Sequence, residues 1–129
     1  MKKLAVLGVV LVLGLVLAVG AIAADPDKGA IKKQVDDIVA AIDGGKKAED
    51  FADAAKKEPY YVFIMQADAK LLVHPTLVGQ SLKEKAEPVY KEVSTGTPEG
   101  IWVKYVWKEK EKNTYVRKTK SGLIVGSGY

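Results

Sequence analysis

Hydrophobic residues gather most densely in residues 60–75, which read YYVFIMQADAKLLVHP. Six residues rich in β-branched and aromatic side chains come first, a polar break follows, and a second apolar run ends at His74-Pro75. This pattern predicts a β-hairpin, with Asp68 in the turn because its side chain can bond the backbone two residues further on. The two faces of the first strand are Tyr61, Phe63 and Met65 on one side and Tyr60, Val62, Ile64 and Gln66 on the other. Both faces are largely apolar, so we expect both to be covered.

Residues 28–43 carry apolar side chains at spacings of four, three, one and three, which is typical of one stripe of an α-helix. The stripe is Ile31, Val35, Ile38, Val39 and Ile42. Asp25 or Asp27 can cap the start of this helix, and Pro26 suits a first-turn position. Gly44-Gly45 is expected to end it.

Two shorter helical stretches are also predicted. Residues 48–57 place Ala48, Phe51, Ala52 and Ala55 inward, and Pro59 ends the stretch. Ser81 and Glu84 form a capping-box pattern, so a helix should begin immediately after Ser81. Pro88 then either kinks this helix or restarts it.

The end of the chain holds three strand candidates, residues 101–107, 114–118 and 123–128. The intervening residues 108–113 and 119–122 are short enough to be turns, so the three strands should run antiparallel in sequence order. With the hairpin and the helices, this predicts an α+β domain in which helices pack on an antiparallel sheet.

The first residues have the pattern of a signal peptide, predicted over residues 1–23. A basic Met1-Lys2-Lys3 precedes a long uncharged apolar run, and small residues at Ala21 and Ala23 predict cleavage before Ala24. The product would be one periplasmic or secreted domain, with a helical region at 24–59 and a sheet and pocket region at 60–129. The alternative is an uncleaved membrane anchor, because the run approaches the ~20 residues that span a bilayer.

Charge and composition exclude several classes of function. The formal net charge is +4 and includes Lys2 and Lys3, and basic and acidic residues interleave along the rest of the chain, so no nucleic-acid surface is expected. With no cysteine, the domain needs a packed core instead of disulfides. One histidine and no Asp-x-Asp loop argue against a metal site. No nucleophile elbow or phosphate-binding glycine loop is present, so we expect neither an enzyme nor a cofactor.

Five segments in order carry a resemblance to a known family. The succession YVFIMQADAKLLVHP, LVGQSL, GIWVKYVW, KNTYVRK and GLIVGSGY closely resembles the single Cache domains, the extracytoplasmic sensor modules of bacterial receptors. The resemblance implies a long N-terminal helix packed on a five-stranded antiparallel sheet of PAS-like topology. It also implies a small-molecule pocket between the sheet and the loops and short helices over it.

The chain departs from this family in three respects. Ala69 stands where the hairpin turn usually has glycine, and Gln66 stands where an acid is common. Positive φ at Ala69 would add about 1 kcal/mol of strain. Cache sensors are normally followed by a membrane helix and a signalling domain, whereas the sequence ends after the last strand. We therefore expect a free-standing module that hands its ligand state to a separate membrane partner.

The resemblance also suggests the binding residues, since relatives of this type often bind small carboxylates. Lys112 and Tyr115 lie in the segment KNTYV, where the lysine would pair with a carboxylate and the tyrosine would donate a hydrogen bond. Alternation along residues 101–107 places Tyr105 and Trp107 on one face, which we choose for the pocket because a buried tyrosine hydroxyl needs a partner. Lys112 as a solvated turn residue and Trp107 as core are the competing interpretations.

His74 and Phe63 complete the predicted site. A neutral imidazole at the end of a strand suits the rim of a pocket, although it could equally satisfy a backbone group there. Phe63 would shape the wall together with Trp107.

The predicted function is that of an exported sensor-type domain for a small organic anion. The alternative is a ligand-free module that regulates a separate membrane receptor or sensor kinase. A polar, solvent-accessible pocket favours the first, and a pocket filled by Phe and Trp side chains favours the second.

Overall fold

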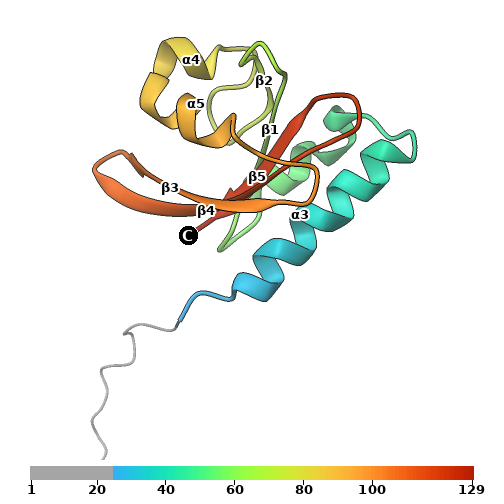
Figure 1. The fold of residues 1–129 in the computed structure, drawn as a ribbon, viewed down its shortest axis with the longest axis horizontal. Helices are drawn as coiled ribbons and strands as arrows, with labels where there is room; N and C mark the ends of the chain where they lie inside the picture. Colours follow the sequence, from blue (N-terminus) through green and yellow to red (C-terminus); the bar gives the residue numbers. More distant parts are fainter. Residues whose placement is uncertain (1–24) are drawn as a thin grey trace, which may run out of the picture.

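The computed structural model describes residues 25–129, which form helices packed on a five-stranded antiparallel sheet (Figure 1). The strands are β1 (Val62–Met65), β2 (Leu71–Val73), β3 (Ile101–Trp107), β4 (Lys110–Lys118) and β5 (Ile124–Gly128). Their spatial order is β2-β1-β5-β4-β3. The predicted α+β class is confirmed, and the arrangement is consistent with a PAS-like fold.

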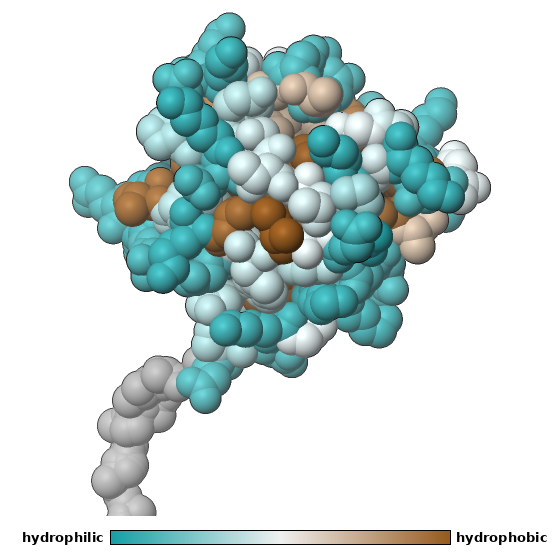
Figure 2. Space-filling model, viewed as in Figure 1, coloured by the Kyte–Doolittle hydropathy of each residue, from teal (hydrophilic) through white to brown (hydrophobic). Residues whose placement is uncertain are grey.

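The predicted signal peptide and its cleavage position lie outside the described residues. Between residues 25 and 129, no helix combines the length and the apolar character that crossing a membrane requires. On the face shown in Figure 2, hydrophilic side chains predominate and the hydrophobic patches are small and separate.

The long helix α3 (Lys28–Asp43) has the predicted bounds. Asp27 caps it, and its Oδ1 accepts a hydrogen bond of 2.9 Å from the Ala30 N–H. Pro26 precedes this cap, so its predicted first-turn position is wrong. The five apolar residues of the predicted stripe are buried, and the helix packs on β5 and β4.

The second helical stretch, η2 (Ala48–Lys56), is a 3₁₀ helix with a break at Phe51, where φ is −109° and ψ is 21°. Ala48 and Ala55 are buried as predicted, but Ala52 is exposed. The expected inward position of Ala52 assumed a regular helical turn. The 3₁₀ geometry has about three residues per turn, and the break at Phe51 shifts the face further.

The predicted hairpin is confirmed as β1 and β2, which pair antiparallel. Asp68 accepts a 3.1 Å hydrogen bond from the Lys70 N–H in the turn. Ala69 has a φ of 79°, the left-handed conformation that favours glycine. Both faces of β1 are buried: Val62 and Ile64 pack with α3, and Phe63 and Met65 pack on the opposite side.

The β3–β4 turn is shorter than predicted, because β4 begins at Lys110 instead of residue 114. Only Lys108 and Glu109 connect the two strands, with φ values of 52° and 69°. A two-residue hairpin with positive φ at both central positions has the twist that suits antiparallel strands. The largely charged residues 110–113, which were short enough to fit a predicted turn, continue the ladder with β3 instead.

Two short helices, α4 (Leu82–Lys85) and α5 (Glu87–Val93), cover the face of the sheet opposite α3 (Figure 1). The Ser81 hydroxyl caps α4 by accepting a 3.3 Å bond from the Glu84 N–H. Pro88 lies in the first turn of α5, so it restarts the helix. These helices and the sheet enclose the space in which the site lies.

A polar cluster fastens α3 to the sheet. The Asp36 carboxylate accepts hydrogen bonds from Lys32 Nζ at 2.9 Å and from Arg117 Nη1 at 3.0 Å. The Tyr115 hydroxyl is 3.2 Å from the same carboxylate and 3.1 Å from the Glu99 carbonyl oxygen. Burial alone would raise the pKa of Asp36, but the hydrogen bonds from Lys32 and Arg117 outweigh it and lower the pKa.

We expect Tyr115→Phe to lower the free energy of unfolding by about 1–2 kcal/mol, because it removes a buried hydroxyl from two acceptors. Urea denaturation followed by circular dichroism measures this. The matched control is Tyr129→Phe, because the Tyr129 ring packs against Trp102 as the Tyr115 ring does, but its hydroxyl makes no hydrogen bond to Asp36 in the described part of the chain. Equal losses in the two variants would contradict an anchoring role for the Tyr115 hydroxyl.

Candidate functional site

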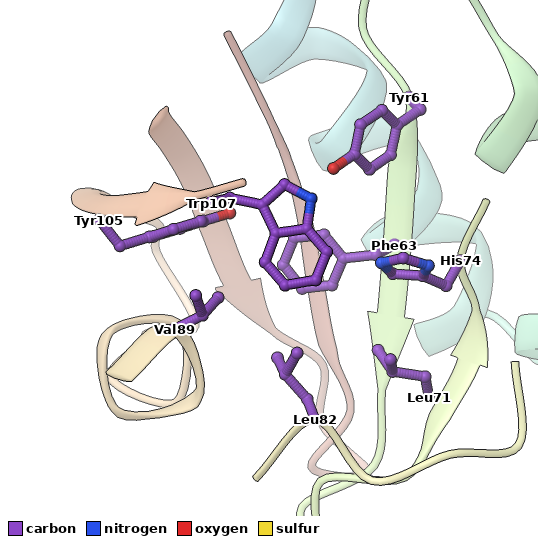
Figure 3. Close-up of a pocket in the computed structure, with 8 residues that line it drawn as sticks. All are labelled: Tyr61, Phe63, Leu71, His74, Leu82, Val89, Tyr105 and Trp107. Atoms are coloured by element: carbon purple, nitrogen blue, oxygen red, sulfur yellow. The ribbon is translucent and has the colours of Figure 1, made fainter. Parts of the chain in front are cut away.

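A small cavity lies between the sheet and the short helices α4 and α5 (Figure 3). Around it, aromatic rings from β1, β3 and the residues directly before β1 and after β2 meet aliphatic side chains from β2 and the two helices. The lining residues are Tyr61, Phe63, Leu71, His74, Leu82, Val89, Tyr105 and Trp107. A second cavity adjoins it, shares three of these rings, and is also lined by Lys112 and Thr114 of β4.

Glycines of β5 make room for this arrangement. A Cβ at Gly126 would lie 2.5 Å from Phe63 Cζ, and one at Gly128 would lie 2.6 Å from Thr114 Oγ1. The pattern Gly-Ser-Gly therefore leaves this face of the central strand without side chains at residues 126 and 128, so that the Phe63 ring can lie against the backbone. The intervening Ser127 points to the other face, where it accepts a 2.8 Å hydrogen bond from Gln34 of α3.

The tyrosines supply neutral hydroxyl groups. Tyr105 Oη accepts a 3.0 Å hydrogen bond from Thr114 Oγ1, which leaves the phenolic proton free to be donated. Burial raises the pKa of Tyr105 to about 12, and the nearby Tyr61 adds to this shift. Burial also raises the pKa of Tyr61. Both side chains are therefore uncharged hydrogen-bond donors at neutral pH.

Lys112 brings the positive charge to this group. Its Nζ lies 5.5 Å from the centre of the Tyr61 ring, a cation–π distance, and the side chain is half-buried. Burial lowers the pKa of Lys112, and the neighbouring Lys110 lowers it further. Both effects disfavour the charged form, so an anion bound here would be favourable.

His74 has a fixed orientation. Its Nδ1 accepts hydrogen bonds from the backbone N–H groups of Thr76 and Leu77, both at 3.0 Å. The proton of the neutral imidazole is consequently on Nε2, which makes this atom a donor. Burial lowers the pKa of His74 to about 4, with a smaller contribution from the charge of Lys108. The ring packs edge-on against Tyr61 and Trp107, with centroids 6.2 Å apart in each pair.

Side chains nearly fill both cavities. Their volumes are about 20 Å³ and about 10 Å³. On this measure one water molecule needs roughly 10–15 Å³, so the main cavity holds about one water. This is closer to the filled pocket that we associated with an interaction module than to an open polar pocket. Any larger ligand requires a lining side chain to move.

The structure brings together most of the residues predicted from sequence. Phe63, His74, Tyr105 and Trp107 line the main cavity, and Lys112 lines the second one. Tyr115 does not belong to this group, because its side chain lies on the α3 face in contact with Asp36. Lys112 and Tyr115 are three positions apart on one strand, and alternation sends them to opposite faces.

Tyr61 is the aromatic lining residue that the sequence-based site omitted, and the aliphatic lining residues Leu71, Leu82 and Val89 were omitted as well. Tyr61 directly precedes β1, two positions before Phe63, which was assigned to the site, so the predicted alternation already contained the signal. Thr114 was also omitted, although it lies two positions from Lys112 and hence on the same face. Among residues 25–129, no cluster of His, Asp or Glu side chains could hold a metal ion.

Comparison with known proteins gives a likeness of fold. No family model matches the chain, and no curated protein sequence matches it. Its fold is similar to that of a methyl-accepting chemotaxis protein from Vibrio parahaemolyticus RIMD 2210633, with a TM-score of 0.50 and 12% sequence identity. The match covers 79% of this chain and 86% of that chain. At this identity the likeness shows the shared fold.

The burial of neutral His74 predicts a pH-dependent stability. The unfolded histidine titrates near 6.5 and the folded one near 4, so the unfolded state binds more protons between these values. We expect the free energy of unfolding to fall as the pH is lowered from 6.5 to 4. In His74→Asn, whose amide oxygen can accept the same backbone bonds, the slope should be smaller. Urea titrations at several pH values measure this.

Asp36 does not confound the comparison. Its pKa is lowered from 3.8, so its contribution to stability is present above 3.8 and is lost only below that pH, equally in both proteins. Parallel pH profiles for the wild type and His74→Asn would contradict the buried neutral state of His74.

Proposed function

We propose that the chain is a sensor domain of the single Cache type that binds a small monocarboxylate. The observation that carries this proposal is the convergence of four polar groups on two adjoining cavities. Lys112 supplies a cation, and Tyr61, Tyr105 and the Nε2–H of His74 supply hydrogen-bond donors. A carboxylate has two oxygens that accept such bonds, and its charge requires a cation when it is buried.

The lining also favours one kind of carboxylate. Opposite the polar groups, the main cavity is walled by Leu71, Leu82 and Val89 (Figure 3), which suit a short apolar tail. No aspartate or glutamate of residues 25–129 lines either cavity, so the ammonium group of an amino acid would lack a partner. Within the described part of the chain, Lys112 is the one cation that lines them, so a second carboxylate on the ligand would be buried without a counter-charge.

The site works by binding alone in this proposal, without catalysis. The leader pattern of residues 1–23 supports export, with release by cleavage before Ala24. The fold shared with a chemotaxis protein supports a role in sensing. A separate membrane protein would then receive the ligand-bound state.

A second candidate function is a protein-interaction module without a small ligand. Two observations favour it: the cavities are nearly full, and β3 exposes apolar side chains on the face away from the pocket. Trp102 is 39% exposed and Val106 is 65% exposed on this edge strand. Such side chains are common in protein interfaces.

A thermal-shift screen of residues 24–129 tests the binding proposal. We expect acetate, propionate or another short monocarboxylate to raise the melting temperature, because a ligand that binds only the folded state stabilises it by about 2.7 kcal/mol at a hundredfold its dissociation constant. Glycine and succinate serve as matched compounds with an extra ammonium or carboxylate and should give smaller shifts. No shift with any carboxylate, together with capture of a membrane protein that Val106→Asp abolishes, would favour the interaction module.

Removal of the cation tests the assigned site. We expect Lys112→Met to weaken carboxylate binding by about 1.5–3 kcal/mol, or roughly 10- to 150-fold, because it deletes a charge-assisted bond while keeping an apolar stem. Lys104→Met is the matched control: Lys104 lies on the neighbouring strand β3 and points to the opposite face, towards Glu111. Isothermal titration calorimetry measures both. Equal losses of affinity would remove Lys112 from the site.

A further inference from the structure

Tyr61 borders three separate hollows of the described part of the molecule. It lines the main cavity and the adjoining cavity that contains Lys112. It also lines a surface groove of about 400 Å³ that residues 55–59 and Pro75 form on the outside. Among residues 25–129, no other side chain is shared by all three. The Tyr61 ring is therefore the wall between the outer groove and the two inner cavities.

The closed cavities require one wall to move before a carboxylate can bind. Most of the lining is held in place: Phe63, Leu71, Leu82 and Val89 are at most 5% exposed. Tyr105 is bonded to Thr114, and His74 is bonded to two backbone N–H groups. Tyr61 and Trp107 remain as half-buried rings that can swing aside.

Tyr61 is better suited to this motion than Trp107. Within the described residues its hydroxyl makes no hydrogen bond, and its ring is held by an edge contact with His74 and by the Lys112 ammonium. Its carbonyl oxygen accepts a 2.8 Å bond from the buried Ser127 hydroxyl, which keeps the backbone in place. The ring can thus rotate about its side-chain bonds without disturbing β1.

The charges on either side of the ring also favour an anion. Lys56, Lys57 and Glu58 line the outer groove, which leaves a surplus of positive charge there. Inside, the Lys112 ammonium lies 5.5 Å from the ring centre. Positive charge outside raises the local concentration of anions, and positive charge inside holds them.

We propose that Tyr61 is a gate. Small anions pass from the basic groove at Lys56 and Lys57 to Lys112 when the Tyr61 ring swings outward. This inference rests on the proposed function, since it names the route by which the carboxylate reaches the site. It assigns Tyr61 the control of access and of ligand size.

The test uses an engineered thiol inside the cavity, because the chain has no cysteine of its own. Val89→Cys places a thiol of similar volume in the main cavity, and Val78→Cys places one on the surface, where Val78 is 60% exposed. Iodoacetate and iodoacetamide are the probes: in each case the thiolate displaces iodide and forms a thioether. The two reagents are close in size, and only iodoacetate is an anion. Mass spectrometry gives the alkylation rates.

In the Val89→Cys protein we expect Tyr61→Ala to raise both alkylation rates by about tenfold or more, because access scales with the open fraction of the gate. In the Val78→Cys protein it should change neither rate. The double substitution Lys56→Gln and Lys57→Gln should lower the iodoacetate rate relative to the iodoacetamide rate at the inner thiol. If Tyr61→Ala does not fold, Tyr61→Val opens the same wall and keeps a strand-forming residue.

Acceleration by Trp107→Ala but not by Tyr61→Ala would overturn the proposal and place the passage at Trp107. If the lysine substitutions leave the ratio of the iodoacetate rate to the iodoacetamide rate unchanged, the groove does not select anions and that part of the proposal is overturned. These outcomes are independent of the thermal-shift screen. If Tyr61→Ala accelerates alkylation but no carboxylate raises the melting temperature, the gate stands and the proposed ligand class is refuted. If a carboxylate raises the melting temperature but Tyr61→Ala leaves the alkylation rates unchanged, the gate alone is refuted.

Discussion

The contact between Phe63 and Gly126 at the centre of the sheet controls how both layers of the protein pack. Gly126 has no side chain, so the aromatic ring of β1 lies against the backbone of β5 instead of standing away from it. On the opposite face of β5, Val125 and Ser127 pack towards α3. At residues 125–128, β5 therefore carries side chains on its helix side, whereas on its cavity side Ile124 is followed by two glycines. This asymmetry leaves room for the Phe63 ring beneath the short helices.

Much of the fold followed from the sequence where one local signal dominated. The bounds of α3 were predicted correctly because a single apolar stripe, a capping aspartate and a pair of glycines agree. The β3–β4 turn was predicted too long because Lys108 and Glu109 take positive φ without glycine or asparagine. Nothing in their side chains indicates that conformation. The adjacent residues of β4 pair with β3 beyond the part of the sheet that the helices cover. Because they are exposed, they are charged and lack the apolar alternation by which strands are recognised.

The candidate site was predictable to the extent that strand alternation could be applied. Alternation along β3 correctly grouped Tyr105 with Trp107, and the same rule along β4 would have separated Lys112 from Tyr115. The orientation of His74 was not predictable, because it depends on backbone N–H groups in the following loop. The size of the cavity was not predictable either. It is the small difference between the volume that the sheet and helices enclose and the volume of the side chains within it.

A cavity with room for about one water has a consequence for the timing of any response. Binding then requires a prior opening of the protein, so the observed dissociation constant exceeds the intrinsic one by the inverse of the open fraction. The speed of exchange is set by side-chain motion instead of diffusion in solution. If the domain senses a ligand as proposed above, it would average the ligand concentration over the interval between openings. Brief fluctuations outside the protein would be smoothed, and sustained changes would be recorded.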